Sequence, residues 1–424
     1  MTQPPGCSGV QALIYSKILP YLEANGWEFH FVGPAPRLTS VLTEDVQCPP
    51  NRLHYTNHVS WSRRFSVFKN RQPKKSFAFY VYGLLQFFSR TLEKLLRHHS
   101  LGHLTAGLQK TITAADSAWD FDLIAGKSPD FMILKAVARL TKDLKKPLVA
   151  MIVDPYGKRD GNLFIPYELS TQAEILEQCC GAMFMSPLTC ERYIQSGLVG
   201  QEKAYSFTDS YPSSEHLYLK GMSSLPRLPD FQSKEVNQCP IHMVHLGMLP
   251  EWRPIETLLE AIESLSIPVF VDFFGYVYPA ARQTIQSNSS LCNRIRCNKA
   301  VGYEDSHLIA EDCSVLLVII GPRHLDNQPS KFFEYLGHRK PLLVLGPPGN
   351  PIEGIVNNLG IGVYCDILNR DSIIDGINKI SNQYSKFVST YDTNNDKIEI
   401  FSASKVAKHW RDCLDKMLSA SSEV

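Results

Sequence analysis

The chain has 424 residues, of which 44% are hydrophobic, and a formal net charge of +1 at pH 7. This length exceeds an ordinary single core, so we expect a globular protein with two domains. No window approaches the roughly 18 unbroken apolar residues of a membrane span, and the start MTQPPGCSG lacks a signal-peptide pattern, which predicts a cytoplasmic protein.

The first part of the chain alternates helical and strand patterns. A glycine loop, PPGCSG, is followed by an amphipathic helix over 10–24 and a strand over 28–32. Gly6 and Gly9 would let a phosphate or an acceptor approach the backbone closely, although an ordinary βα turn also uses such glycines. The loop is therefore a candidate binding element.

Short apolar strands follow at 122–125 and 148–153, with a helix over 129–144 between them. Further units are expected at 182–186 and 203–207. Asp154 follows the second strand directly, at the edge where cleft residues of parallel sheets gather. It is a candidate for acceptor contact, and a helix-capping role is equally open.

Residues 61–99 form a basic, aromatic segment with nine Lys or Arg and the single acid Glu93. Helices of this composition often lie on anionic membrane surfaces, which would make the protein peripheral on the inner face of the membrane. A core-facing helix with a solvated basic side is an equal alternative. RNA binding is the third interpretation of the segment, because nothing in it resembles an RNA-binding module. We therefore expect no nucleic-acid partner.

The histidines and cysteines give no metal signal. His99 and His103 are spaced for a helical metal pair, but Gly102 interrupts the helix and no carboxylate is near in sequence. The eleven cysteines contain no CxxC, so neither a zinc site nor a disulfide framework is predicted, and most should be buried thiols. We expect no metal and no cofactor.

A stretch rich in Ser, Pro and charge over 209–239 predicts an interdomain linker. The domains would then be 1–208, 240–400 and a C-terminal helix over 401–424 that docks back across them. Beyond the linker, strands are expected at 241–247, 269–275, in RIRCNKAVG (294–302) and at 314–320, and helices at 254–264, near 279–287 and near 305–312. The second half is thus another parallel α/β sheet.

The segment DNQPSKFFEYLGHRKPLLVLG, residues 326–346, combines a helix with an apolar strand. Pro329 suits the first helical turn, with Asn327 or Gln328 as the cap. Lys331 beside a helix N-terminus would favour an anion, and Glu334 could accept hydrogen bonds from a ribose diol. A solvated i,i+3 ion pair on an ordinary helix is the alternative.

In its ordered landmarks the chain resembles the GT-B-fold glycosyltransferases, in particular the family 4-like nucleotide-sugar transferases. The landmarks are PPGCSG, DFDLIAGKSPD with KPLVAMIVDPYG, LGMLPEWRPIETLLEAI, VGYEDSHLIAEDCSVLLVII and DNQPSKFFEYLGHRKPLL. The resemblance implies an α/β protein of two Rossmann-like domains facing a central cleft. The N-terminal domain would hold the acceptor and the C-terminal domain the donor nucleotide sugar.

The resemblance also implies roles for single residues. The family has two glutamates separated by seven residues; here Asp326 stands in the first position and Glu334 in the second. Glu334 would bind the nucleotide ribose, Asp326 would face the donor sugar, and Arg253 and Lys331 would neutralise the diphosphate. Met248 replaces the family's usual arginine. The remaining donor-binding candidates are Asn327, Gln328, Ser330, Gly247, Gly275 and Tyr303.

The function expected from this resemblance is transfer of a sugar from a nucleoside diphosphate donor, with retention of anomeric configuration. The acceptor would be a sugar or a lipid-linked sugar in polysaccharide or glycolipid assembly. Two cations near the leaving diphosphate would make a metal unnecessary. One alternative is a nucleotide-sugar epimerase on the same scaffold. The other is a degenerate transferase that acts as a binding subunit, which the departures from the family pattern at Met248 and Asp326 would explain.

Overall fold

The structure is a computed structural model that describes residues 10–34, 50–56, 65, 68–69, 72–73, 76–96, 102–127, 131–153, 166–212 and 241–421. These residues divide into two compact units. Unit 1 holds the described residues up to Phe207 together with those from Ala407 onward, and unit 2 holds those from Thr208 to Val406. None of the described helices is long and apolar enough to cross a membrane.

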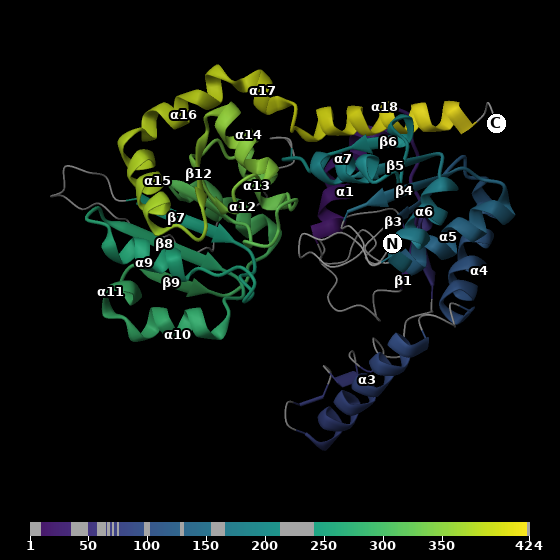
Figure 1. The fold of residues 1–424 in the computed structure, drawn as a ribbon, viewed down its shortest axis with the longest axis horizontal. Helices are drawn as coiled ribbons and strands as arrows, with labels where there is room; N and C mark the ends of the chain where they lie inside the picture. The colour runs from purple at the N-terminus through teal and green to yellow at the C-terminus, as the bar shows by residue number, and fades with distance from the viewer. Residues whose placement is uncertain are drawn as a thin grey trace. The chain divides into compact units, whose positions relative to one another are not determined.

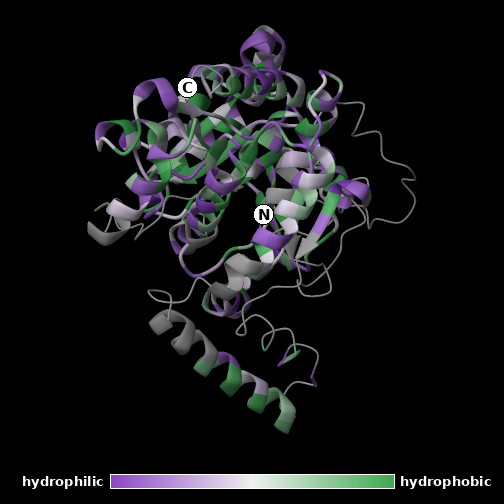
Figure 2. Ribbon diagram, turned by 90° about the vertical axis from the view of Figure 1, so that its right-hand side faces the viewer, coloured by the Kyte–Doolittle hydropathy of each residue, from purple (hydrophilic) through white to green (hydrophobic). Residues whose placement is uncertain are grey.

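Unit 1 is built from helices and short parallel strands. Its helices are α1 (Val10–Glu23), α3 (Phe77–Leu96), α4 (Gly102–Trp119), α5 (Phe131–Leu144), α6 (Pro166–Glu177), α7 (Pro187–Gln195) and most of α18 (Ala403–Ser421). Its strands are β1 (Phe31–Pro34), β2 (Leu53–Thr56), β3 (Ile124–Lys127), β4 (Leu148–Ile152), β5 (Gly181–Phe184) and β6 (Ala204–Ser206). The first half of α3 is rich in apolar side chains (Figure 2).

The core of unit 1 lies on a four-stranded parallel sheet of order β3-β4-β5-β6, and β1 and β2 form a separate parallel pair. Every residue of β4 and β5 is buried, as expected of central strands of a parallel sheet. Helix α7 begins cleanly because Ser186 accepts a hydrogen bond from the Thr189 N–H and Pro187 occupies the first turn.

Unit 2 contains longer strands with helices between them. Its strands are β7 (Ile241–Leu246), β8 (Val269–Phe274), β9 (Ile295–Asn298), β10 (Val315–Ile319), β11 (Leu342–Gly346) and β12 (Gly362–Asp366). Its helices are α9 (Glu256–Ser264), α10 (Pro279–Ser287), α11 (Ser289–Cys292), α12 (Tyr303–Asp312), α13 (Ser330–Leu336), α14 (Pro351–Leu359), α15 (Arg370–Asn382), α16 (Tyr384–Thr393) and α17 (Asn395–Glu399).

The six strands of unit 2 are all parallel and lie in the order β12-β11-β10-β7-β8-β9. This is the doubly wound Rossmann order, in which the chain reverses its direction of winding between the first and fourth strands. The reversal falls between the adjacent strands β7 and β10. Ligands of such sheets bind outside the carboxyl ends of the strands at this point.

Two helical layers cover the six-stranded sheet of unit 2 (Figure 1). Ile241 and Met243 of β7 pack into the core that contains residues of α9, α10, α11 and α15. Val244 and Leu246 pack into the opposite core, with α12, α13 and α14. The alternation follows from the two-residue period of a strand, and it gives each side of the sheet a separate hydrophobic core.

The predicted α/β class is confirmed, and the expected strands of both halves are present with small shifts of their ends. One prediction about α13 is wrong. Pro329 is the N-cap residue, with ψ 132, and no side chain caps the helix, so neither Asn327 nor Gln328 does so. The reason is local, because an extended Pro329 delays the first helical residue to Ser330.

The eight cysteines in the described ranges are free thiols, and five of them are buried: Cys179, Cys190, Cys313, Cys365 and Cys413. Burial raises the pKa of Cys190 to about 11 and of Cys313 to about 12, so these thiols stay protonated at neutral pH. They behave as small core residues.

Candidate functional site

The loops that follow β7 and β10 lie against each other at the reversal point of the unit 2 sheet. The rings of Trp252, after β7, and His324, after β10, stack with centroids 4.6 Å apart and an interplanar angle of 21°. A Cβ atom added to Gly321 would come within 2.4 Å of the Trp252 carbonyl oxygen, so only glycine permits this approach. The two loops form one surface at the carboxyl ends of the strands.

The loops that follow β7 and β8 are equally close. Gly275 has a φ of 132°, and a Cβ atom at this position would lie 2.3 Å from the Gly247 carbonyl oxygen. Both the left-handed backbone and the contact require glycine at 275. Gly247 and Gly275 therefore lie together, as the shared position of their strand ends predicts.

A buried histidine lies beneath these loops near the end of β7. The Nδ1 atom of His245 is 3.0 Å from the Leu317 carbonyl oxygen of β10, and because that oxygen can only accept, Nδ1 carries the proton. The Nε2 atom is buried and has no hydrogen-bond partner. A Cβ atom added to Gly247 would lie 3.5 Å from it. His245 thus presents an unused acceptor beneath the loop.

The same histidine lies in the field of two cations. Burial lowers the pKa of His245 to about 4, the hydrogen bond to Leu317 partly opposes this shift, and the charges of Arg253 and Lys331 lower the pKa further. The imidazole is therefore neutral at physiological pH. The two cations belong to separate elements, the loop after β7 and helix α13, and both charges lower the pKa of the same imidazole.

Helix α13 brings a buried carboxylate to this place. Glu334 is 3% exposed, and one of its carboxylate oxygens accepts a hydrogen bond from the Lys331 Nζ atom at 2.8 Å. The Lys331 ammonium also lies 5.9 Å from the ring centroid of Tyr303, the first residue of α12. The i,i+3 pair is thus present but its acid is not solvated, unlike a surface pair.

A tyrosine fixes α13 against β7. The Leu246 N–H donates a hydrogen bond of 2.9 Å to the Tyr335 hydroxyl oxygen, and the Tyr335 side chain is fully buried. Because Tyr335 follows Glu334 in the helix, this bond sets where the carboxylate lies relative to the strand end.

The segment before α13 is held by one amide. The Asn350 Nδ2 atom donates to the carbonyl oxygens of His324, Leu325 and Asn327, at 3.2, 3.0 and 3.0 Å. Its Oδ1 atom accepts from the Ile352 N–H and so caps α14. Asn350 therefore shapes the backbone on either side of Asp326.

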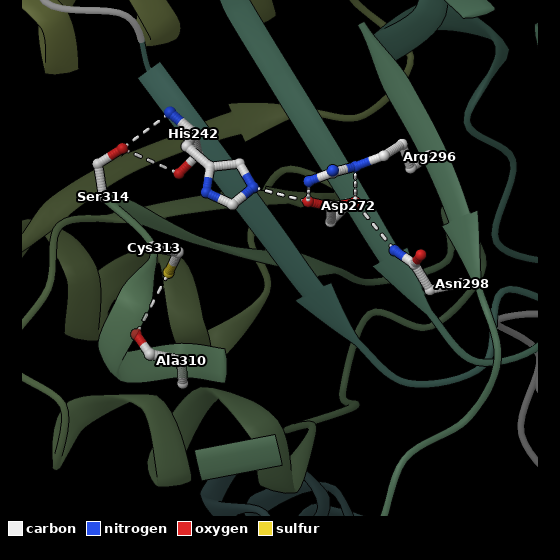
Figure 3. A network of polar contacts seen from close by, with 7 residues as sticks. All are labelled: His242, Asp272, Arg296, Asn298, Ala310, Cys313 and Ser314. Carbon is white, nitrogen blue, oxygen red and sulfur yellow. Dashed lines mark hydrogen bonds and ion pairs between the residues drawn. The ribbon is translucent and has the colours of Figure 1, made fainter. Parts of the chain in front are cut away.

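Another polar cluster in unit 2 is fully satisfied and lies on the strands themselves (Figure 3). The Asp272 carboxylate accepts from His242 at 2.8 Å, from the guanidinium of Arg296 and from Asn298 at 2.9 Å. Burial alone would raise the pKa of Asp272, but these hydrogen bonds lower it to about 2. Every oxygen is occupied, so we interpret the cluster as structural.

The structure brings together several of the residues that the sequence singled out. Lys331 contacts Glu334 and lies near Tyr303, Arg253 and Lys331 both lower the pKa of His245, and Gly247 lies beside Gly275. Asp326 is half-buried in the turn held by Asn350. Gln328 and Ser330 complete the segment; the Gln328 side chain is buried and its Oε1 atom has no partner.

Met248 is 67% exposed. Gly6, Gly9 and Asp154 lie outside the described residues.

Sequence reasoning missed His245 and Asn350. Both form hydrogen bonds with residues that are distant in the sequence, so no local sequence pattern indicates them. The one available signal for His245 was a polar residue inside an apolar strand, two positions before the glycine that ends it.

No protein-family model matches the chain, and no curated protein matches its sequence. Among solved structures it is similar to sucrose-phosphate synthase from Thermosynechococcus elongatus, with a TM-score of 0.63, 12% identity and coverage of 99% of this chain and 97% of the other. The trehalose-6-phosphate structure from E. coli bound with UDP-2-fluoro glucose has a TM-score of 0.62, 13% identity and coverages of 98% and 97%.

Anabaena Alr3699/HepE in complex with UDP is similar over 77% of this chain and 89% of its own, with a TM-score of 0.57 and 13% identity. These neighbours are GT-B glycosyltransferases. The chain has the GT-B fold. Identities this low establish the fold alone. In this GT-B chain, the convergence of cations and a buried carboxylate lies at the reversal point of the C-terminal sheet.

Proposed function

We propose that the protein transfers a hexosyl group from a nucleoside diphosphate sugar to an acceptor, with retention of anomeric configuration. The observation that carries the proposal is the buried Glu334 bonded to Lys331 on α13, with Arg253 on the loop after β7, at the reversal point of a Rossmann-ordered sheet. Two cations at this point match a diphosphate, and a buried carboxylate matches a vicinal diol. The UDP and UDP-sugar complexes of the structural neighbours support the same class of donor.

In this proposal the cationic residues would bind the diphosphate and the carboxylates would bind the sugars. Arg253 and Lys331 would hold the diphosphate and stabilise the negative charge that develops as the sugar leaves. Glu334 would bind the ribose and Asp326 would orient the donor sugar, as in the D-x7-E pattern. Because two fixed cations already oppose this charge, we propose that transfer needs no metal, and EDTA should leave the rate unchanged.

The acceptor we propose is a sugar or a lipid-linked sugar in polysaccharide or glycolipid assembly. We further propose that the protein is a peripheral protein of the inner face of the membrane. This part rests on the sequence resemblance and on the basic aromatic segment. The acceptor side would involve Gly6, Gly9 and Asp154.

The variant Glu334→Ala tests the donor assignment. It should weaken nucleotide binding about tenfold to a hundredfold, because a hydrogen bond to a charged group contributes roughly 1.5–3 kcal/mol, and it should largely abolish transfer. Calorimetric titration with nucleoside diphosphates, after a thermal-shift screen to find the base, gives the affinity. Glu260→Ala, at an exposed site on α9, is the matched control. Unchanged affinity in Glu334→Ala would refute the donor assignment.

Product analysis separates the competing activities. Donor incubated alone should yield no epimer, whereas an epimerase would convert it. Donor with a saccharide or lipid-linked acceptor should yield a product with the donor's anomeric configuration. A folded protein that binds nucleotide but neither hydrolyses nor transfers any donor would instead be a binding subunit.

A further inference from the structure

Helix α3 of unit 1 turns its apolar side chains toward solvent. Phe77 is 86% exposed, Phe87 64% and Leu84 58%. Four more large apolar side chains of the same helix are exposed by more than a third: Tyr80, Val81, Leu85 and Phe88. Soluble helices place such residues in the core, so this pattern requires a separate explanation.

The exposed side chains form one continuous arc. At about 100° per residue, the seven positions span roughly 160° of the helix circumference, without a polar residue among them. We call this set, Phe77, Tyr80, Val81, Leu84, Leu85, Phe87 and Phe88, the α3 arc. The opposite side of the helix contains Gln86, which is buried. The helix thus exposes a wholly apolar arc while a polar side chain is buried on its other side.

The inward side of α3 is already occupied by the preceding segment. The ring of Tyr82 stacks on Phe68 with centroids 5.6 Å apart, and the Lys69 ammonium lies 4.9 Å from the ring centroid of Phe79. A Cβ atom added to Gly83 would lie 3.6 Å from the Lys69 side chain. These contacts occupy one side of the helix, and the arc is the side that remains exposed.

We propose that the α3 arc docks on the surface of an anionic lipid bilayer, with the helix lying in the plane of the interface. Charge decides between a bilayer and another protein: residues 61–99 carry nine Lys or Arg against one acid, which matches anionic headgroups. Aromatic side chains are also the residues that favour the boundary between headgroups and acyl chains. The helix is not apolar enough to span a bilayer, so it lies on the surface.

This proposal does not depend on the transfer chemistry. It is tested by co-sedimentation of the full chain with vesicles of phosphatidylcholine alone and of phosphatidylcholine mixed with phosphatidylserine. The wild type should bind the anionic vesicles, and added salt should weaken binding because it screens the basic residues. The double variant Leu84→Gln/Phe88→Gln should bind on the order of a hundredfold less tightly, because two apolar side chains no longer enter the interface.

The double variant Leu368→Gln/Ile400→Gln is a matched control, since both side chains are similarly exposed but belong to unit 2. It should bind like the wild type, and both variants should keep the wild-type melting temperature because no buried contact is removed. Binding of Leu84→Gln/Phe88→Gln at wild-type strength, or equal binding of the wild type to neutral vesicles, would overturn the proposal. Absence of vesicle binding together with a dimer that this variant dissociates would assign the arc to a second copy of the chain.

Discussion

At the residue scale, His242 and His245 lie three positions apart on β7 and have different surroundings. The His242 imidazole donates to the buried Asp272 carboxylate, so its polarity is matched. The Nε2 acceptor of His245 has no partner, and an unsatisfied buried acceptor costs roughly 1–3 kcal/mol. Such a cost is typical of a functional site, where a ligand supplies the missing partner. A hydroxyl of the bound nucleotide sugar would do so.

The variant His245→Asn tests this assignment, because Asn retains a donor where Nδ1 bonds Leu317 but lacks the Nε2 acceptor. Nucleotide-sugar affinity should fall about fivefold to tenfold, the value of one hydrogen bond, as measured by calorimetric titration at neutral pH. His242→Asn is the matched control and should lower stability through the Asp272 cluster without changing affinity. Equal affinity of His245→Asn and wild type would contradict the role of Nε2.

The same variant has a pH signature in the free energy of unfolding. The folded-state pKa of His245 is about 4, below its usual 6.5, because of burial. As the pH falls from 6.5 to 4 the unfolded chain takes up a proton that the folded chain does not, so the wild type loses up to about 3 kcal/mol over this window. Asn does not titrate, and denaturant unfolding of the variant should lack this loss.

At the element scale, Asn350 determines how the 324–327 turn meets α13. The variant Asn350→Ser keeps a good N-cap for α14 but cannot reach the three carbonyl oxygens. The turn that contains Asp326 should then relax, and nucleotide-sugar affinity should fall about tenfold, in proportion to one or two lost hydrogen bonds.

Asn369→Ser is the matched control for this change, because Asn369 caps α15 by its side chain and lies away from the turn. It should leave affinity unchanged in the same titration. A similar effect of both variants would mean that capping, and not the carbonyl contacts, matters.

How far the sequence predicts these elements depends on where their contacts lie. The apolar runs of β7, β8 and β10 specify strands locally. Lys331 and Glu334 were found from their place at a helix N-terminus, and Arg253 from the family resemblance. The partner of His245 is 72 residues away and that of Asn350 about 25, so only the fold reveals either role. Our sequence interpretation also assigns no element to 347–401, although α14 and α15 place buried apolar residues at helical spacing there.

At the scale of the whole molecule, the last helix of the chain completes the core of the first unit. The Trp410 ring of α18 is 3% exposed and meets Phe207 with centroids 4.8 Å apart and Tyr15 at 6.0 Å, both edge to face. Cys413, Leu414 and Met417 of the same helix are buried with it. Unit 1 is thus closed by residues that follow unit 2 in the sequence, so the described residues of unit 1 are not one continuous stretch of chain.

The variant Trp410→Ala should therefore destabilise unit 1 and spare unit 2. Removing a buried indole costs about 3–5 kcal/mol, whereas Trp119→Ala in α4 should cost less because that side chain is 43% exposed. Calorimetry with and without a nucleoside diphosphate identifies the transitions, since a ligand of unit 2 raises the transition of the unit that binds it. If Trp410→Ala lowered the nucleotide-sensitive transition and left the other unchanged, α18 would stabilise unit 2, contrary to the packing of Trp410 on Tyr15 and Phe207.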